Sequence, residues 1–317
     1  MNDERQILIT VQFSQEQLDE LDSLATDFKV VSRPLSQGQE LPEEEWASVE
    51  ILYTIRVLPQ PEQAPKMRWI QFHLAGIEEH LDQPILRQVS VQATSLSGAN
   101  APQVAEHALA LMLALGHHLP EMVADQSRNQ WATQRSQRYV PKELLNSTVG
   151  IIGYGSVGQR LARLLQSFGV TVLASKRDLL KAQSKALRSL LKECDYVVVT
   201  VPLTQETRGM LGAKQLSAMK PSAILVDVSR GGVVDQEALI HALEKGQFAA
   251  AGLDVFAEEP LPADSRLWDL PNVLISPHVA GLSPHYVERA FTLFKENLRR
   301  YVDGEELLNK IDLERGY

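Results

Sequence analysis

The sequence predicts an α/β protein that contains a doubly wound parallel sheet. An apolar run at residues 149–152 has the length of a buried parallel strand. The pattern Gly153-x-Gly155-x-x-Gly158 follows this run at once, and residues 159–168 then place apolar side chains at helical spacing. Strand and helix patterns continue to alternate after residue 168, which is typical of a sheet with helices on both faces.

The strand, glycine turn and helix are expected to bind a dinucleotide. Gly153 permits a tight turn, Gly155 lets a pyrophosphate approach the backbone, and Gly158 lets the helix pack closely on the strand. The helix N-terminus offers N–H groups and a partial positive charge to the phosphates. The cofactor-binding residues predicted here are Gly153, Tyr154, Gly155, Ser156, Val157 and Gly158. The alternative is a strand-to-helix turn whose glycines serve packing alone.

Composition narrows the class of protein. A chain of 317 residues has room for one large or two ordinary domains. The net charge of -9 argues against nucleic acid as a partner. The single cysteine, Cys194, excludes a disulfide framework and a cysteine-based zinc site, and we predict it to be a packed core thiol with no metal bound. Neither a signal peptide nor a membrane span is predicted, so we expect a cytoplasmic protein.

The N-terminal part predicts a small α/β domain that precedes two helices. Its expected strands are residues 7–11, 49–53, 69–72 and 90–93, and a capping box at residues 14–17 begins a helix. Apolar spacing predicts a long helix at 100–118 and a second at 119–131, and residues 136–145 are expected to be a connection. Trp131 is interpreted either as an interface anchor or as a plug at the edge of the core.

The remaining elements extend the dinucleotide-binding sheet. Strands are expected at residues 170–174, 196–200, 223–228, 250–255 and 273–275. Helices are expected at 185–192, 213–219, 235–245 and 284–301, with Gly246 closing the third of them.

The end of the strand at 170–174 bears on which dinucleotide binds. An acidic residue about twenty positions past the glycines ordinarily holds the ribose hydroxyls of NAD, but Ser175, Lys176 and Arg177 occupy that place. A carboxylate would repel a 2′-phosphate, whereas Lys176 and Arg177 can pair with one. We therefore favour NADP(H) over NAD(H). The alternative is that these are solvent charges and that other residues hold the ribose.

Polar residues just after the later strands are candidates for chemistry, because ligands bind beyond the carboxyl ends of a parallel sheet. Arg230, beside two glycines, has a planar guanidinium that suits a carboxylate, although it could be a surface arginine on a turn. Asp254 ends an apolar strand and is expected to be buried or to face the cofactor. Glu258 and Glu259 form an acidic pair, of which one could be a loop charge. His278 follows the last strand and is the candidate general acid or base.

Together these stretches resemble the D-isomer-specific 2-hydroxyacid dehydrogenases, a family that includes glyoxylate/hydroxypyruvate reductases and phosphoglycerate dehydrogenases. The residues that carry the resemblance are 74–77 (LAGI), 100–106 (NAPQVAE), 148–158 (TVGIIGYGSVG), 201–207 (VPLTQET), 219–234 (MKPSAILVDVSRGGVV), 252–260 (GLDVFAEEP) and 276–281 (SPHVAG).

The resemblance implies a fold of two domains with a split chain. A Rossmann domain at residues 99–283 would be inserted in a smaller flavodoxin-like α/β substrate domain formed by residues 1–98 and 284–317. The long helix that begins near Asn100 would belong to the Rossmann domain and form the contact of a homodimer.

The resemblance also implies a reaction, the reduction of a small 2-keto acid to the D-2-hydroxy acid. Its catalytic residues would be Arg230, Glu259 and His278, with Glu259 chosen because it stands immediately before the proline. The substrate would lie in a cleft between the domains, with its carboxylate held by backbone N–H groups around Ala75, Gly76 and Ile77 and by Arg230. Arg230 would polarise the carbonyl, and His278, hydrogen-bonded to Glu259 in its imidazolium form, would donate a proton to the oxygen.

Further cofactor contacts are implied along the edge of the sheet. They are Val201, Pro202, Thr207, Val228, Ser229, Arg230, Asp254, His278 and Gly281. Two other functions stay open at this point: an NAD-linked dehydrogenase of a larger or phosphorylated 2-hydroxy acid, and a non-catalytic protein that senses a dinucleotide.

Overall fold

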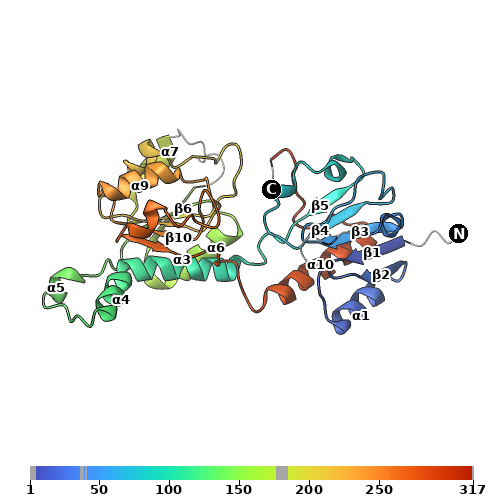
Figure 1. The fold of residues 1–317 in the computed structure, drawn as a ribbon, viewed down its shortest axis with the longest axis horizontal. Helices are drawn as coiled ribbons and strands as arrows, with labels where there is room; N and C mark the ends of the chain where they lie inside the picture. Colours follow the sequence, from blue (N-terminus) through green and yellow to red (C-terminus); the bar gives the residue numbers. More distant parts are fainter. Residues whose placement is uncertain (1–4, 36–38, 40, 176–184, 316–317) are drawn as a thin grey trace. The chain divides into compact units, whose positions relative to one another are not determined.

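The computed structural model describes residues 5–35, 39, 41–175 and 185–315 and divides into two compact units. Met1–Asn100 and Ser283–Tyr317 form one, here called the terminal unit, and Ala101–Leu282 form the other, the central unit. The boundaries expected from the sequence were 98/99 and 283/284, and those of the structure are 100/101 and 282/283. Each unit is a parallel sheet covered by helices (Figure 1), so the predicted fold class is confirmed.

Five parallel strands make up the sheet of the terminal unit within the described residues, in the order β2-β1-β3-β4-β5. They are β1 (Arg5–Ile9), β2 (Phe28–Ser32), β3 (Val49–Thr54), β4 (Trp69–Phe72) and β5 (Gln92–Thr94). The helical elements are α1 (Gln15–Leu24), α2 (Glu43–Trp46), η1 (Glu78–His80), η2 (Pro84–Arg87) and α10 (Tyr286–Val302). Every residue of β3 and β4 is buried, as strands covered on both faces require.

Two strands of the terminal unit differ from the prediction. Strand β2 was not predicted, because it is an edge strand in which only Phe28 is buried and its apolar pattern is weak. The strand expected at 90–93 begins later, at Gln92, because Val91 closes a turn by donating its N–H to the carbonyl oxygen of Gln88.

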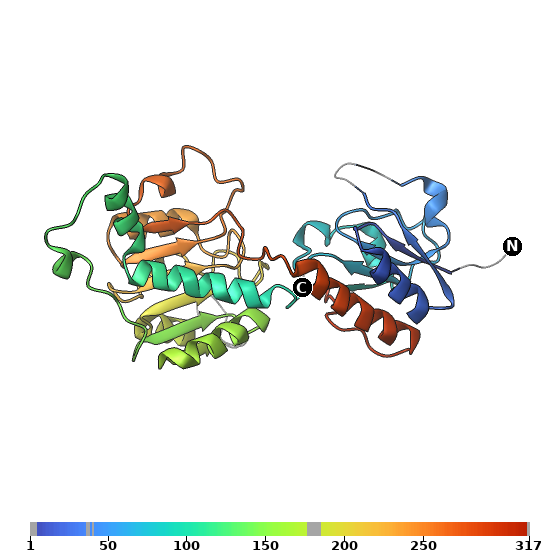
Figure 2. The ribbon, with the colours of Figure 1, turned by 90° about the horizontal axis from the view of Figure 1, so that it is seen from below.

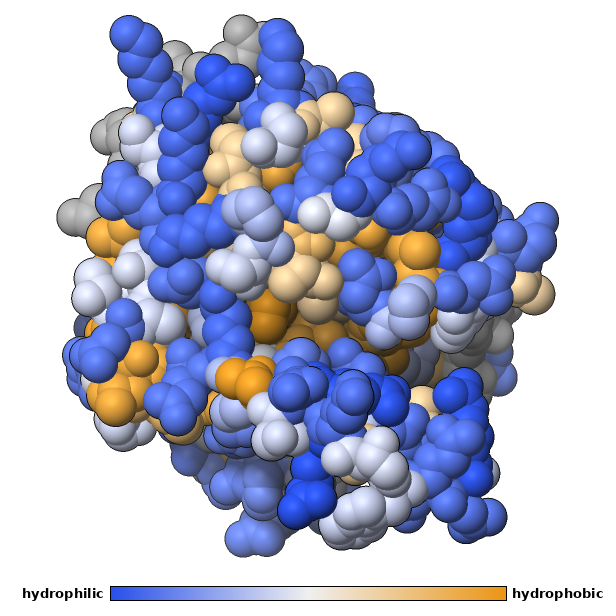
Figure 3. Space-filling model, turned by 90° about the vertical axis from the view of Figure 1, so that its left-hand side faces the viewer, coloured by the Kyte–Doolittle hydropathy of each residue, from blue (hydrophilic) through white to orange (hydrophobic). Residues whose placement is uncertain are grey.

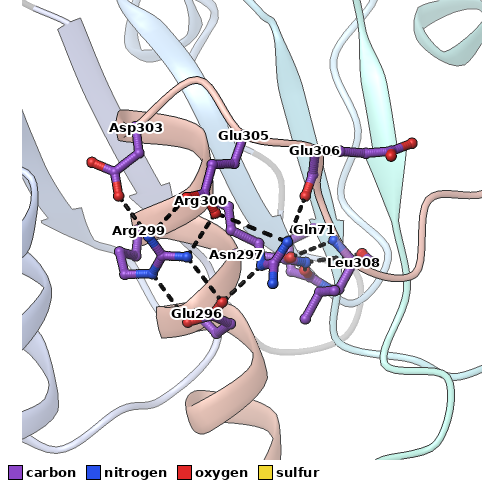
Figure 4. Close-up of polar contacts among 9 residues, drawn as sticks. All are labelled: Gln71, Glu296, Asn297, Arg299, Arg300, Asp303, Glu305, Glu306 and Leu308. Carbon is purple, nitrogen blue, oxygen red and sulfur yellow. Dashed lines mark hydrogen bonds and ion pairs between the residues drawn. The ribbon is translucent and has the colours of Figure 1, made fainter.

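Helix α10 joins the C-terminal residues to the terminal unit, where it lies beside α1 (Figure 2). Phe294 and Leu298 are fully buried in its core. The Asn297 amide is also fully buried, and it donates to Gln71 Oε1 at 3.2 Å and to the carbonyl oxygen of Leu308 at 3.1 Å (Figure 4). These hydrogen bonds tie the segment after the helix to β4. On the surface beside them, Arg299 pairs with acidic side chains around the end of α10.

Six parallel strands form the sheet of the central unit within its described residues, in the order β11-β10-β9-β8-β6-β7. The strands are β6 (Thr148–Ile152), β7 (Thr171–Ser175), β8 (Tyr196–Val199), β9 (Ile224–Asp227), β10 (Ala250–Leu253) and β11 (Val273–Ile275). The helical elements are α3 (Ala101–Gly116), α4 (Leu119–Ser127), α5 (Arg135–Arg138), α6 (Ser156–Leu165), η3 (Gln166–Phe168), α7 (Lys185–Glu193), α8 (Ala213–Leu216), α9 (Gln236–Glu244) and η5 (Arg266–Asp269).

Helices cover both faces of this sheet, as a doubly wound fold requires. Helices α3 and α6 pack on one face, and α7, α8 and α9 pack on the other (Figure 1). The predicted core thiol of Cys194 is fully buried on the second face, where burial raises its pKa to about 12.

The predicted C-terminal end of the helix expected at 119–131 is wrong. Helix α4 ends at Ser127, because Asn129 adopts a left-handed conformation with φ of 54° and the helix cannot continue through it. Trp131 then lies outside the helix with 82% of its surface exposed, which excludes its interpretation as a plug of the core in this chain. The connection expected at 136–145 contains part of the short helix α5. Of the helices in the described ranges, none has both the length and the apolar character to cross a membrane.

Candidate active site

The predicted dinucleotide turn follows β6, and each of its three glycines is required or favoured by a different feature of the surrounding space. Gly153 has φ of 103°, and a Cβ there would lie 2.9 Å from the backbone N of Val201. A Cβ on Gly158 would lie 2.3 Å from the carbonyl oxygen of Gly153, so α6 packs directly on the turn. A Cβ on Gly155 would meet no atom within 4 Å. Space is therefore left beside Gly155, next to the first N–H groups of α6, where a pyrophosphate fits.

The other predicted residues of this turn lie at the start of α6. Tyr154 is partly exposed, and Ser156 and Val157 are the first two residues of the helix. The Thr200 hydroxyl, after β8, donates to the carbonyl oxygen of Gly153 at 2.6 Å and braces the turn from the neighbouring strand. Sequence reasoning did not single out Thr200, because this contact joins residues 47 positions apart.

The residues predicted to select the dinucleotide are only partly visible. Ser175 is the last residue of β7, and its backbone is in register with Ile152, immediately before the glycine turn. Lys176 and Arg177 lie outside the described residues.

After β8, the predicted cofactor residues form a closed turn. Val201 is buried and contacts Gly153, and the Thr207 hydroxyl donates to the carbonyl oxygen of Pro202 at 2.7 Å. The same hydroxyl accepts the N–H of Thr204 at 2.8 Å. These bonds hold the turn beside the glycine loop.

Arg230 follows β9 on a turn held by a buried carboxylate. Asp227 Oδ1 accepts the Ser229 N–H at 3.0 Å and the Ser229 hydroxyl at 2.5 Å, and Val228 between them is buried. The Arg230 Nη1 donates to the carbonyl oxygen of Ser229 at 2.9 Å. A Cβ on Gly231 would lie 1.7 Å from the carbonyl oxygen of Phe256, so only glycine fits after Arg230.

Asp227 is a buried acid of the candidate site that was not singled out from the sequence. Its side chain is 3% exposed, and burial, with a smaller contribution from the charge of Asp254, raises its pKa from 3.8 to about 7. The two hydrogen bonds from Ser229 lower the pKa but do not compensate for burial. Like Asp254, Asp227 is an acid at the end of an apolar strand, so the same signal in the sequence predicts it.

Glu259 and His278 are brought into direct contact from two different loops. His278 follows β11, and its Nδ1 lies 2.6 Å from Glu259 Oε2. Glu259 Oε1 accepts the N–H of Phe256 at 3.0 Å, so the carboxylate is fixed at both oxygens. The backbone of His278 has φ of 52°, an uncommon conformation for a residue other than glycine. Both side chains keep part of their surface exposed, as a group that meets a ligand must.

Asp254, after β10, is buried and holds the loop that carries His278. Its Oδ1 accepts the Val279 N–H and its Oδ2 accepts the Ala280 N–H, each at 3.0 Å. Ser276 donates its hydroxyl to Oδ1 at 2.6 Å. The side chain is 1% exposed, so in this structure it holds the backbone and does not project into solvent.

The predicted substrate loop belongs to the terminal unit. Ala75 and Gly76 are half-buried, and Ile77 is buried at the start of η1. They follow β4 and the buried His73, whose Nδ1 lies 2.5 Å from the Tyr53 hydroxyl. Burial lowers the pKa of His73 to about 4, so it is neutral near pH 7.

The chemistry at the strand ends of the central unit is that of proton transfer beside an anion-binding group. An imidazole backed by a carboxylate can act as an acid or base, and an arginine can hold a carboxylate or a developing oxyanion. Within the ranges that the structure describes, no three His, Cys, Asp or Glu side chains converge in a way that could hold a metal ion.

Comparisons with known proteins identify relatives of this chain by sequence and by structure. Residues 109–280 fit a family model described as D-isomer specific 2-hydroxyacid dehydrogenase, NAD binding domain. A glyoxylate reductase of Thermococcus gammatolerans is 36% identical over 261 residues, which cover 78% of this chain and 78% of that protein. A D-3-phosphoglycerate dehydrogenase of Methanocaldococcus jannaschii is 30% identical over 260 residues, which cover 80% of this chain and 49% of that protein.

A solved structure shares the fold along almost the whole chain. It is a D-isomer specific 2-hydroxyacid dehydrogenase from Xanthobacter autotrophicus Py2, in complex with NADPH and MES. It is 28% identical, aligns with 99% of this chain and 100% of its own, and has a TM-score of 0.79.

Proposed function

This chain belongs to the D-isomer-specific 2-hydroxyacid dehydrogenase family, and on that premise we propose that it reduces a small 2-keto acid to the D-2-hydroxy acid. The observation that carries the proposal is the contact of 2.6 Å between His278 and Glu259 in the unit that also holds the glycine turn and Arg230. His278, Arg230 and the glycine turn all follow strands of one sheet, which supports the assignment of a proton donor, an anion-binding group and a dinucleotide turn to one site.

Each of the three residues has a separate task in this reaction. His278 donates a proton from Nε2 to the oxygen of the substrate carbonyl, because Nδ1 is engaged by Glu259. Glu259 fixes the ring orientation and compensates for the charge of the imidazolium. Arg230 binds the substrate and polarises its carbonyl. A nicotinamide dinucleotide, held at the glycine turn, supplies the hydride when it is bound.

Substrate recognition includes the loop of Ala75, Gly76 and Ile77, whose backbone N–H groups we assign to the substrate carboxylate. Glyoxylate and hydroxypyruvate are the proposed substrates, supported by the glyoxylate reductase relative that is 36% identical. A larger or phosphorylated substrate is the second candidate, and a relative named D-3-phosphoglycerate dehydrogenase, 30% identical, favours keeping it in the test.

NADP(H) is the proposed cofactor, in preference to NAD(H). The support is the absence of an acidic residue from Ser175-Lys176-Arg177 in the sequence, together with the NADPH named in the Xanthobacter structure. Replacing both Lys176 and Arg177 by alanine should lower kcat/KM for NADPH by roughly tenfold or more, since each loses a charge-assisted contact to the 2′-phosphate. The kcat/KM for NADH should change little.

A homodimer formed by the central unit is also proposed, with Trp131 as an anchor. Helices α4 and α5 and the segments around them expose several large apolar side chains, and Figure 3 shows apolar residues among hydrophilic ones on this side of the unit. Those residues are Leu119, Met122, Val123, Trp131, Val140 and Leu145. Sedimentation of the wild type and of Trp131→Ser tests the assembly, and a monomeric wild type refutes it. The cytoplasmic location stays a prediction.

A steady-state panel tests the proposed reaction. Glyoxylate, hydroxypyruvate, pyruvate and phosphohydroxypyruvate are each assayed with NADPH and with NADH, and we expect the highest kcat/KM for glyoxylate or hydroxypyruvate with NADPH. A preference for phosphohydroxypyruvate would favour the second candidate, and a preference for NADH would refute the cofactor assignment. Tight dinucleotide binding without any turnover would favour a sensing protein.

Two variants test the residues. His278→Asn and Arg230→Ala should each lower kcat/KM by about a hundredfold or more, because proton donation and electrostatic stabilisation contribute at least that much. His241→Asn, an exposed histidine of α9, is the matched control and should keep wild-type kinetics. If both site variants keep near-normal turnover of every 2-keto acid in the panel, the assignment is wrong.

A further inference from the structure

Helix α3 contacts both ends of the loop that carries His278. Gln103 Nε2 donates to the carbonyl oxygen of Gly281 at 2.9 Å, and His107 Nε2 lies 2.9 Å from the Ser276 hydroxyl. Gln103 and His107 are four residues apart, so they share one face of the helix. Segment 276–281, with His278 inside it, is therefore bracketed from a single rigid element.

The direction of the hydrogen bonds can be deduced from the groups present. The Ser276 hydroxyl donates its proton to Asp254 Oδ1 at 2.6 Å. Ser276 Oγ must then accept from His107, which places a proton on His107 Nε2. The result is a chain of donors that runs from His107 through Ser276 to Asp254.

Asp254 connects these hydrogen bonds to the backbone of the His278 loop. Its two oxygens accept the N–H groups of Val279 and Ala280, the two residues directly after His278. His278 itself sits at φ of 52°, a conformation that persists only where its surroundings hold it. The contacts of Ser276, Val279 and Ala280 lie on either side of His278, and they hold its backbone by converging on one buried carboxylate.

We propose that His107 and Gln103 are positioning residues, which fix the His278 loop from α3 through Ser276, Asp254 and Gly281. Their hydrogen bonds reach Gly281 and Ser276, which lie on either side of His278. They set where that imidazole stands relative to Glu259, and their loss lets the loop relax. The inference rests on the proposed role of His278 for its kinetic consequence, but its structural consequence is independent of any activity.

Amide hydrogen exchange of the ligand-free protein is the first test. In the wild type, the peptide that covers residues 276–282 should exchange slowly, because Val279 and Ala280 donate to a buried carboxylate. His107→Leu removes the donor to Ser276 and should raise exchange in this peptide by about tenfold. His107→Gln, which keeps an N–H near the position of Nε2, should restore slow exchange. His117→Leu, an exposed histidine just beyond α3, is the control.

Kinetics provide the second test. His107→Leu and Gln103→Leu should lower kcat by about tenfold to a hundredfold, because small displacements of a catalytic group cost that much, while KM for the dinucleotide stays within about twofold. The conservative His107→Gln should recover most of kcat. Ser276→Ala removes the hydroxyl that lies between His107 and Asp254, although His107 Nε2 also lies 3.6 Å from Asp254 Oδ1 directly. This variant substitutes for His107→Leu if His107→Leu does not fold.

The outcomes separate this inference from the proposed function. Faster exchange at 276–282 with a lower kcat, both restored by glutamine, supports positioning. Unchanged exchange and unchanged kcat overturn it, and so does a lower melting temperature with neither of these changes, which would mean a structural role alone. If the wild type turns over no 2-keto acid, the proposed function fails, and the exchange experiment still decides whether α3 holds the loop.

Discussion

Replacing Asp227 with asparagine should make the central unit more stable at alkaline pH. The side chain is 3% exposed and its pKa is raised from 3.8 to about 7, chiefly by burial. Asparagine has nearly the same shape and keeps an oxygen that can accept the N–H and hydroxyl of Ser229. The substitution therefore removes the ionisation and keeps the hydrogen bonds.

The magnitude follows from the two pKa values. Between about pH 4 and pH 7 the folded protein keeps a proton on Asp227 that the unfolded chain has lost, so stability falls as pH rises through this window. At about 1.4 kcal/mol for each pKa unit, the shift from 3.8 to about 7 corresponds to about 4 kcal/mol. Asparagine does not titrate, so the variant escapes this loss. Its stability relative to the wild type should increase by about 4 kcal/mol from pH 4 to pH 8.

Differential scanning calorimetry across this pH range measures the effect, with the transition that shifts on adding dinucleotide assigned to the central unit. The diagnostic quantity is how the difference in free energy of unfolding between variant and wild type changes with pH. Any constant effect of the new amide is the same at every pH and does not contribute to that change. Asp264→Asn, an exposed acid in the same unit, is the control and should show no such trend. A difference between Asp227→Asn and wild type that is flat from pH 4 to pH 8, or that decreases, would refute the reasoning.

Three further predictions concern glycines and the terminal unit. Gly158→Ala should destabilise the ligand-free protein, because the new Cβ would lie 2.3 Å from a carbonyl oxygen. Gly155→Ala should leave thermal stability unchanged, because its Cβ would meet no atom within 4 Å, but it should weaken dinucleotide binding as measured by calorimetric titration. Gly231→Ala, with a Cβ 1.7 Å from a backbone oxygen, should displace the arginine turn and reduce soluble, active protein sharply in an expression and turnover assay. Burial lowers the pKa of His73 from 6.5 to about 4, so the free energy of unfolding of the terminal unit should fall by about 3 kcal/mol as pH falls through that interval. The calorimetric transition of this unit should show that dependence on pH, and His73→Gln should remove it.

Much of the fold could be predicted because local patterns report burial. The apolar run before Gly153 and the spacing along α6 specify a strand, a turn and a helix from neighbouring residues alone. Edge strand β2 was missed because most of its side chains are only half-buried, and the pattern is correspondingly weak. The end of α4 was misplaced because apolar spacing continues past the left-handed Asn129.

The candidate site was predictable to the extent that its residues stand at strand ends. Arg230, Asp254 and His278 each follow an apolar run, so the chemistry of the site can be read from residue types and their places. Asp227 satisfies the same rule and was overlooked. His107 has no such signal, because it lies within an apolar helix and contacts Ser276, 169 residues away.

The sequence by itself determined most of the strands of both sheets, which glycines turn the chain and which residue types follow the strands. These depend on the steric and hydrophobic properties of residues that are neighbours along the chain. Only the tertiary structure decided that Asp254 holds the histidine loop and that Asp227 is buried beside Ser229. It also contains the contact between Glu259 and His278 that the family resemblance implies. Those contacts arise where parallel strands bring loops together at one edge of the sheet. The burial and the hydrogen-bond partners of a side chain at this edge depend on residues that are distant along the chain, so local sequence patterns do not predict them.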